Sequence, residues 1–178
     1  MNVESILYRG IVNKDFRVTY LYQFESEGPY QTVVDKGSKI CVRPSFAITI
    51  SEGFDKSRMF IPAYKYFQFV LLLKKTIKKI SANLYDIFPN INSSEFEVDS
   101  RVLERFQTEQ AMASGGMTMV PCVWVDQASQ CYPSIRVTSL NGNVVIPLED
   151  AISISQMLQT FDPHQFGLSV LRILGKIE

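Results

Sequence analysis

The chain has 178 residues, 46% of them hydrophobic, and its 18 Lys and Arg balance 18 Asp and Glu to leave no net charge. This length and apolar content are enough to bury a core, as one domain or two fused halves, without disulfides or metal. A neutral chain lacks the overall basic character typical of nucleic-acid-binding proteins, so any such function must depend on a local surface.

Strand patterns dominate the first third of the chain. Alternating apolar residues predict strands at residues 7–12, 16–24, 31–34, 44–49 and 59–62. Pro62 then suits the first turn of a helix, because its φ angle is fixed and it has no N–H group to donate. Apolar residues at three- and four-residue steps continue from there to Ile80, which predicts a helix.

The second half of the chain has a similar order. Strand patterns at 117–125, 133–138 and 144–147 precede a helical pattern that runs from 148 to 161. Residues 89–95 are polar and rich in turn formers, and Ser114, Gly115 and Gly116 mark a second flexible point. Between them, residues 100–113 fit either a capped helix or a long irregular excursion.

An internal repeat connects the two halves. The run at 44–49 matches the run at 133–138, since both are Pro-Ser followed by alternating apolar positions and a Thr. The run at 59–62 matches 144–147, and a proline opens the helix in both copies. We therefore predict an α+β fold of two tandem units, each of antiparallel strands followed by a helix. The units cover about 5–88 and 96–165 of one domain, with a C-terminal tail at 166–178.

The sequence also indicates a compartment. The acid and polar residues 1–5 do not resemble a signal peptide. The apolar run 67–73 is flanked by lysines and is far shorter than the roughly 20 residues that cross a bilayer, so we predict no membrane span. Three cysteines without paired spacing favour a reducing environment. We expect an intracellular protein, in the cytoplasm, nucleoid or nucleus, or in the host cytoplasm if the chain is viral.

Catalytic and metal-binding motifs are missing. The chain has no Gly-rich phosphate loop, no Gly-x-Ser-x-Gly and no Cys-x-x-Cys, and its one histidine is His164. Cys122 and Cys131 with one distant histidine do not make a zinc site, which needs four ligands at short paired spacings. We predict a protein that is not an enzyme and that needs no metal or cofactor.

Charge is distributed unevenly along the chain. Residues 1–89 hold 13 Lys and Arg against 8 Asp and Glu, a balance of +5, whereas residues 90–178 hold 5 against 10, a balance of −5. A basic surface can attract phosphate even when the total charge cancels, because salt confines each charge's influence to roughly 10 Å. The alternative is that the asymmetry only reflects the composition of solvated surfaces.

Two segments resemble the single-stranded-DNA-binding superfamily that includes Whirly proteins and transcriptional positive-cofactor-four proteins. The run 36–44, KGSKICVRP, is similar to the Lys-Gly-Lys-Ala-Ala-Leu stretch of Whirly proteins with one inserted residue. The run Val145-Ile146-Pro147 before a helix that ends near 161–164 is similar to their closing strand and helix. The resemblance implies two units of four strands and one helix, with nucleic acid on the strands, and the same pattern is equally compatible with a virus or bacteriophage source.

We therefore expect the chain to bind single-stranded DNA, largely without sequence specificity, in replication, recombination or transcription. Such proteins combine a basic track for phosphates with aromatic side chains on which bases stack. The phosphate candidates are Arg9, Arg17, Lys36, Lys39, Arg43, Lys56, Arg58 and Arg136. The stacking candidates are Tyr20, Tyr22, Phe54, Trp124 and Tyr132, although an aromatic residue in an alternating strand is more often part of a core.

Other interpretations remain open. Single-stranded RNA suits the same aromatic and basic residues. The chain also fits an oligomeric interaction or structural protein, such as a viral assembly component or a transcription cofactor. Lys74, Lys75, Lys78 and Lys79 form the densest basic cluster, which we interpret as a solvated or subunit-facing surface of the first helix. We predict a homo-oligomer, because exposed sheet edges tend to be covered by symmetry mates.

Overall fold

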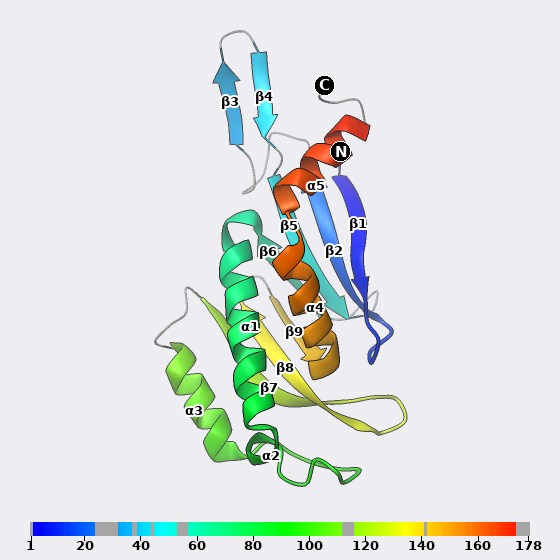
Figure 1. Cartoon of the computed structure of the whole chain (residues 1–178), viewed down its shortest axis with the longest axis vertical. Coiled ribbons are helices and arrows are strands. Elements are labelled where there is room, and N and C mark those ends of the chain that lie inside the picture. The colour runs from blue at the N-terminus through cyan, green and yellow to red at the C-terminus, as the bar shows by residue number, and fades with distance from the viewer. Residues whose placement is uncertain are drawn as a thin grey trace.

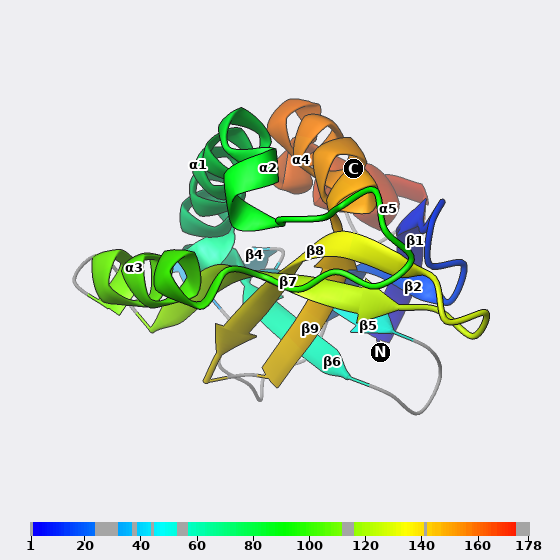
Figure 2. The same cartoon turned by 90° about the horizontal axis from the view of Figure 1, so that it is seen from below.

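The computed structural model describes residues 2–23, 32–36, 39–43, 45–52, 57–111, 116–140 and 142–173. Within them the fold is α+β, as predicted: antiparallel sheets with helices that follow the strand units. Figure 2 shows α1 (Tyr66–Ala82), α4 (Leu148–Thr160) and α5 (Pro163–Ile173) on one side of the two larger sheets. The other side of these sheets is called the outer face below.

The first unit forms a four-stranded antiparallel sheet. Its strand order is β1–β2–β5–β6, with β1 at Asn2–Arg9, β2 at Phe16–Gln23, β5 at Ser45–Glu52 and β6 at Arg58–Pro62. Phe16, Val18 and Tyr20 alternate along β2 and are at most 1% exposed, because they face the helices. The first strand lies earlier than the predicted 7–12, since the chain turns at residues 10–15 to enter β2.

A separate two-stranded ribbon is inserted between β2 and β5. It consists of β3 (Thr32–Lys36) and β4 (Lys39–Arg43), which pair antiparallel. Figure 1 shows this ribbon extending beyond the end of the four-stranded sheet. The described residues of the run that resembles the Whirly stretch, 36 and 39–43, therefore belong to this projecting ribbon.

The second unit forms a three-stranded antiparallel sheet. Its order is β7–β8–β9, with β7 at Met117–Val125, β8 at Cys131–Ser139 and β9 at Gly142–Pro147. The resemblance implied four strands in each unit, but the described part of this sheet has three. The helix α3 (Ser100–Ala111) packs against β7. The segment at 100–113 is thus a helix over most of its length, and it begins after Asp99, whose carboxylate accepts the Arg101 N–H at 2.9 Å.

The repeated motif has the same structure in both units. Pro62 ends β6 with φ −67° and ψ 156°, and Pro147 ends β9 with φ −52° and ψ 140°. A short 3₁₀ turn, η1 (Ala63–Lys65), precedes α1 in the first copy, whereas α4 follows Pro147 directly. The helices α1 and α4 pack against each other. The two hairpin–proline–helix motifs therefore share one helical layer over both sheets.

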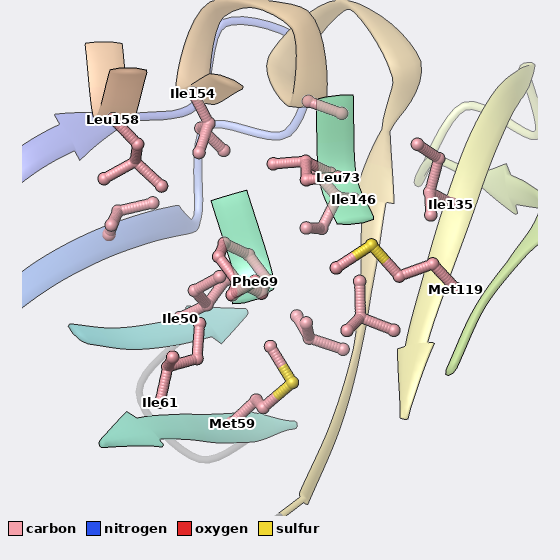
Figure 3. Close-up of a cluster of buried hydrophobic side chains, with 14 of the residues drawn as sticks. Ile50, Met59, Ile61, Phe69, Leu73, Met119, Ile135, Ile146, Ile154 and Leu158 are labelled. Carbon is pink, nitrogen blue, oxygen red and sulfur yellow. The ribbon is translucent and has the colours of Figure 1, made fainter. Parts of the chain in front are cut away.

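One hydrophobic cluster joins both units. Figure 3 shows Met59 and Ile61 of the first sheet, Met119 and Ile146 of the second, and Leu73 of α1 in this cluster. All five are at most 1% exposed. A short helix, α2 (Leu84–Ile87), follows α1. Residues 163–173 form α5, and Phe166 packs against the core, so the described part of the expected C-terminal tail is helical.

Candidate nucleic-acid interface

Three arginines form a row across the outer face of the four-stranded sheet. Arg9 is opposite Arg17 in the register of β1 and β2, Arg17 is opposite Ser51, and Ser51 is opposite Arg58. Arg9 and Arg58 are exposed, and Arg17 is half-buried. Like charges directly opposite each other destabilise a sheet, whereas a bound anion would relieve their repulsion. This arginine row is the most concentrated basic feature of a sheet face within the described residues.

The next two rows of the same face are less charged. The middle row is Ile6, Thr19, Thr49 and Phe60, and the row beyond it is Glu4, Leu21, Ala47 and Pro62. Ile6 is 45% exposed, whereas Thr49 is only 1% exposed although it points away from the helices. The face therefore places apolar and hydroxyl groups beside the arginine row.

An ion pair links the two edge strands of this sheet. The Glu4 carboxylate in β1 lies 3.7 Å from the Arg58 guanidinium in β6. On a flat sheet the two residues would be about 14 Å apart across the strands and roughly 13 Å apart along them. Their side chains can meet only if the sheet curves toward its outer face. The outer face is therefore concave along the Glu4–Arg58 diagonal, as in a twisted sheet.

Aromatic and basic residues also lie on the outer face of the three-stranded sheet. Trp124 is opposite Tyr132, and their ring centroids are 5.5 Å apart with a tilt of 43°. The Trp124 indole N–H donates to the Glu52 carboxylate at 3.0 Å, so the end of β7 is tied to the end of β5. Arg136 lies on the same face and is exposed. Both aromatic rings are half-buried, which leaves part of each accessible.

A groove of about 1180 Å³ runs between β7 and the segment that joins α2 to α3. Glu95, Glu97 and Asp99 line one side, and Arg136 and Cys122 line the other. Burial raises the pKa of the Cys122 thiol to about 12, and the charge of Arg136 only partly opposes this. The acidic lining makes the groove a poor phosphate site, and the thiol stays protonated at neutral pH.

Tyr20 is a correction to the predicted interface. It is 1% exposed, its ring stacks on Phe46, and its hydroxyl donates to the Pro163 carbonyl at 2.9 Å. A tyrosine can be fully buried where a carbonyl accepts its hydroxyl, and here the start of α5 provides that carbonyl. The choice of Tyr20 as a stacking residue was wrong.

Apart from Tyr22, the remaining predicted residues fall into four groups. Arg9, Arg17 and Arg58 share one face, and Trp124, Tyr132 and Arg136 share another. Tyr22 lies in β2. Lys36, Lys39 and Arg43 lie in the β3–β4 ribbon, where Lys36 is opposite Lys39. Phe54 and Lys56 lie outside the described residues.

The comparisons with known proteins add nothing to this geometry. No family model, curated protein or solved structure matches the chain. Across the described ranges, no group of three or more His, Cys, Asp or Glu side chains could hold a metal ion. In the same part of the chain, no helix has both the length and the apolar character needed to span a membrane.

The sequence-based prediction missed the residues that surround the arginines on the sheet. Glu4, Thr19, Thr49 and Phe60 become neighbours only through the pairing of four strands that are up to 56 residues apart. The basic cluster of α1 is divided, because Lys79 lies 4.2 Å from the centre of the Phe106 ring, whereas Lys74, Lys75 and Lys78 are exposed. The sequence did contain a signal for the outer face, since Arg17, Thr19 and Leu21 alternate with the core residues of β2.

Proposed function

We propose that the protein binds single-stranded DNA, largely without sequence specificity, on the outer faces of its two sheets. The observation that carries the proposal is the arginine row, with Arg9, Arg17 and Arg58 in register on the outer face of the four-stranded sheet. Arginine binds phosphate through two parallel N–H donors, which makes such a row suitable for a sugar–phosphate backbone.

The neighbouring residues suit unpaired bases. Ile6 and Phe60 lie in the row beside the arginines, and Trp124 and Tyr132 form an aromatic pair on the second sheet. Stacking on an aromatic side chain contributes about 1–3 kcal/mol per base and does not depend strongly on which base is stacked. A duplex hides its base faces, so this surface favours single strands.

The test is a fluorescence-anisotropy titration of labelled oligo-dT at several salt concentrations. The triple variant Arg9→Ala, Arg17→Ala, Arg58→Ala should bind weakly, and the slope of log affinity against log salt should fall by about 0.7 for each lost phosphate contact. The matched control is Lys74→Ala, Lys75→Ala, Lys78→Ala, which removes the same charge from the exposed side of α1. Equal loss in both variants, or a flat salt response of the wild type, would contradict the proposal.

Competition decides which nucleic acid is preferred. Unlabelled duplex DNA should fail to displace oligo-dT, because its bases are not available for stacking. Single-stranded RNA is the alternative ligand, since only contacts to the 2′-hydroxyl distinguish it from DNA. Stronger competition by oligo-U than by oligo-dT would identify the protein as an RNA binder.

A second candidate function is protein association through α1. Tyr64 of η1 and Phe67 and Leu71 of α1 are 74%, 70% and 67% exposed, and their spacing of three and four residues places them on one side of this helical segment, called the α1 stripe. Large apolar side chains that gather on one exposed surface are typical of interaction sites. This α1 stripe lies on the helical layer, on the opposite side from the arginine row, so both functions can coexist.

A further inference from the structure

Thr49 has an unusual environment in the middle of the outer face. Its hydroxyl oxygen is buried and has no hydrogen-bond partner among the described residues. Ile48 and Ile50 on either side of it are fully buried in the core, so Thr49 points to the opposite face of β5. A buried hydroxyl without a partner lowers stability, and such groups are uncommon enough in folded proteins to call for a specific explanation.

The Glu4–Arg58 ion pair lies over this position. Glu4 is in the row on one side of the Thr19–Thr49 row, and Arg58 is in the row on the other side. The pair connects β1 to β6, so it must cross the two central strands that carry Thr19 and Thr49. Both threonines are at most 5% exposed, although the described helices α1, α4 and α5 lie on the other side of the sheet (Figure 2).

We infer that this position is a phosphate subsite, and that Glu4 is an internal competitor that occupies it when no nucleic acid is bound. The inference rests on the proposed function, because the ligand is a backbone phosphate of the single strand. The phosphate replaces the Glu4 carboxylate beside Arg58, and the Thr49 hydroxyl then donates to one of its oxygens. Glu4 thereby lowers the affinity of the site, and Thr49 becomes fully bonded only in the complex.

The chemistry of the pair favours such an exchange. Both side chains are more than half exposed, at 58% for Arg58 and 56% for Glu4. Exposed ion pairs contribute little to stability, so displacing Glu4 from Arg58 is easy. A backbone phosphate is tetrahedral, so its two non-bridging oxygens can accept from the guanidinium and from a hydroxyl on different sides.

Glu4→Gln tests the competitor. This variant keeps the shape of the side chain and removes its charge, so oligo-dT should bind roughly 2- to 5-fold more tightly at low salt. The matched control is Asp86→Asn, which changes the net charge equally at an exposed position of α2. Equal tightening by the two variants would show a general charge effect and would overturn the inference.

Thr49→Val tests the hydroxyl. Valine has nearly the same shape, so the urea midpoint of unfolding should stay the same or rise, because an unpartnered polar group is removed. Oligo-dT binding should weaken roughly 3- to 10-fold, as expected for one lost hydrogen bond. Thr160→Val, at an exposed position at the end of α4 on the helical side, is the control and should bind as the wild type does.

The outcomes separate the two proposals. If the wild type binds and the arginine-row variant does not, yet Glu4→Gln and Thr49→Val both bind like the wild type, only the phosphate subsite is refuted. If neither the wild type nor Glu4→Gln binds oligo-dT at low salt, the proposed function fails together with the subsite. If Glu4→Gln binds oligo-dT tightly and the wild type does not, the result would support both the proposed function and the phosphate subsite.

Discussion

Asp150, in the first turn of α4, accepts a hydrogen bond of 2.7 Å from the hydroxyl of Tyr8 in β1. The same carboxylate accepts the backbone N–H groups of Ile11 at 2.6 Å and Asn13 at 3.2 Å. Asp150 is fully buried, and the N-terminus of a helix stabilises a negative charge there. The helix of the second unit therefore holds the β1–β2 turn of the first unit in place.

Replacing Asp150 should destabilise the whole fold. Asp150→Ala removes three hydrogen bonds and leaves buried donors unpaired, so we expect the free energy of unfolding to fall by about 3 kcal/mol or more. Tyr8→Phe removes one of these bonds and should cost about 1 kcal/mol. Urea unfolding followed by circular dichroism measures both, and Glu149→Ala, at the exposed neighbouring position, should change the value by less than about 0.5 kcal/mol.

The two substitutions should not be additive. Because Tyr8 and Asp150 share a hydrogen bond, the double variant should lose less stability than the sum of the single variants, by about 0.5 kcal/mol or more. Strict additivity would mean that the hydrogen bond does not contribute to stability.

Two tyrosines, the half-buried Tyr8 and the buried Tyr66, should make stability depend on alkaline pH. Burial, followed by the hydrogen bond to Asp150 and its charge, raises the pKa of Tyr8 from 10.0 to about 12. Burial, followed by the charge of Asp162, raises the pKa of Tyr66 from 10.0 to about 12, and its hydroxyl donates to the Leu158 carbonyl at 2.7 Å. The unfolded chain therefore loses these protons first, so their contribution to stability is complete below pH 10 and is lost as pH rises toward 12.

We expect the free energy of unfolding to fall more steeply between pH 10 and 12 in the wild type than in Tyr66→Phe. Urea titrations at intervals of half a pH unit measure this slope. Tyr85→Phe, at a 69% exposed position of α2, should keep the wild-type slope. An unchanged slope in Tyr66→Phe would contradict the assignment of the buried phenol.

Local rules were sufficient for the repeated motif of the fold. Pro62 and Pro147 could be placed because a proline that ends a strand and opens a helix has a backbone reason that acts within a few residues. The alternation in β2 also predicted which residues share a face. It did not reveal which face is buried, and Tyr20 was assigned to the wrong role because its acceptor, the Pro163 carbonyl, lies 143 residues away in sequence.

The candidate site depends on long-range pairing in the same way. Arg9, Arg17 and Arg58 were each identified as candidates, but only the strand order β1–β2–β5–β6 puts them in one row. Asp150 looked like an ordinary acidic residue in the first turn of a helix, and nothing near it in sequence indicates the β1–β2 turn that it binds. Loop lengths and strand order, which local patterns do not determine, made the difference.

Gly142 fits a close contact between the two units. Its φ is +121°, and a Cβ atom there would overlap the carbonyl oxygen of Arg58 at the start of β6. Gly142→Ala should therefore lower the free energy of unfolding by more than about 1 kcal/mol, through both backbone strain and overlap. Gly116→Ala is the matched control, since its φ is +83° but its nearest neighbours are 3.9 Å away. Equal losses in the two variants would mean that the overlap with Arg58 is relieved without cost.

Trp124 offers a direct probe of the second sheet, because it is the only tryptophan of the chain. If single-stranded DNA stacks on the Trp124–Tyr132 pair, oligo-dT should quench its emission, and the quenching should saturate at the same concentration as the anisotropy. Added salt should reverse it. Saturated anisotropy without any change in emission would restrict the interface to the four-stranded sheet.

The α1 stripe should mediate self-association. Leu71→Glu puts a charge beside Tyr64 and Phe67. It should therefore shift sedimentation toward a monomer of 20.3 kDa at micromolar concentration. Leu140→Glu makes the same chemical change at an 89% exposed residue between β8 and β9 and should keep the wild-type assembly. Because α1 lies on the helical side, away from the outer faces, the monomeric Leu71→Glu variant should still bind oligo-dT. A wild type that sediments only as a monomer would refute the homo-oligomer.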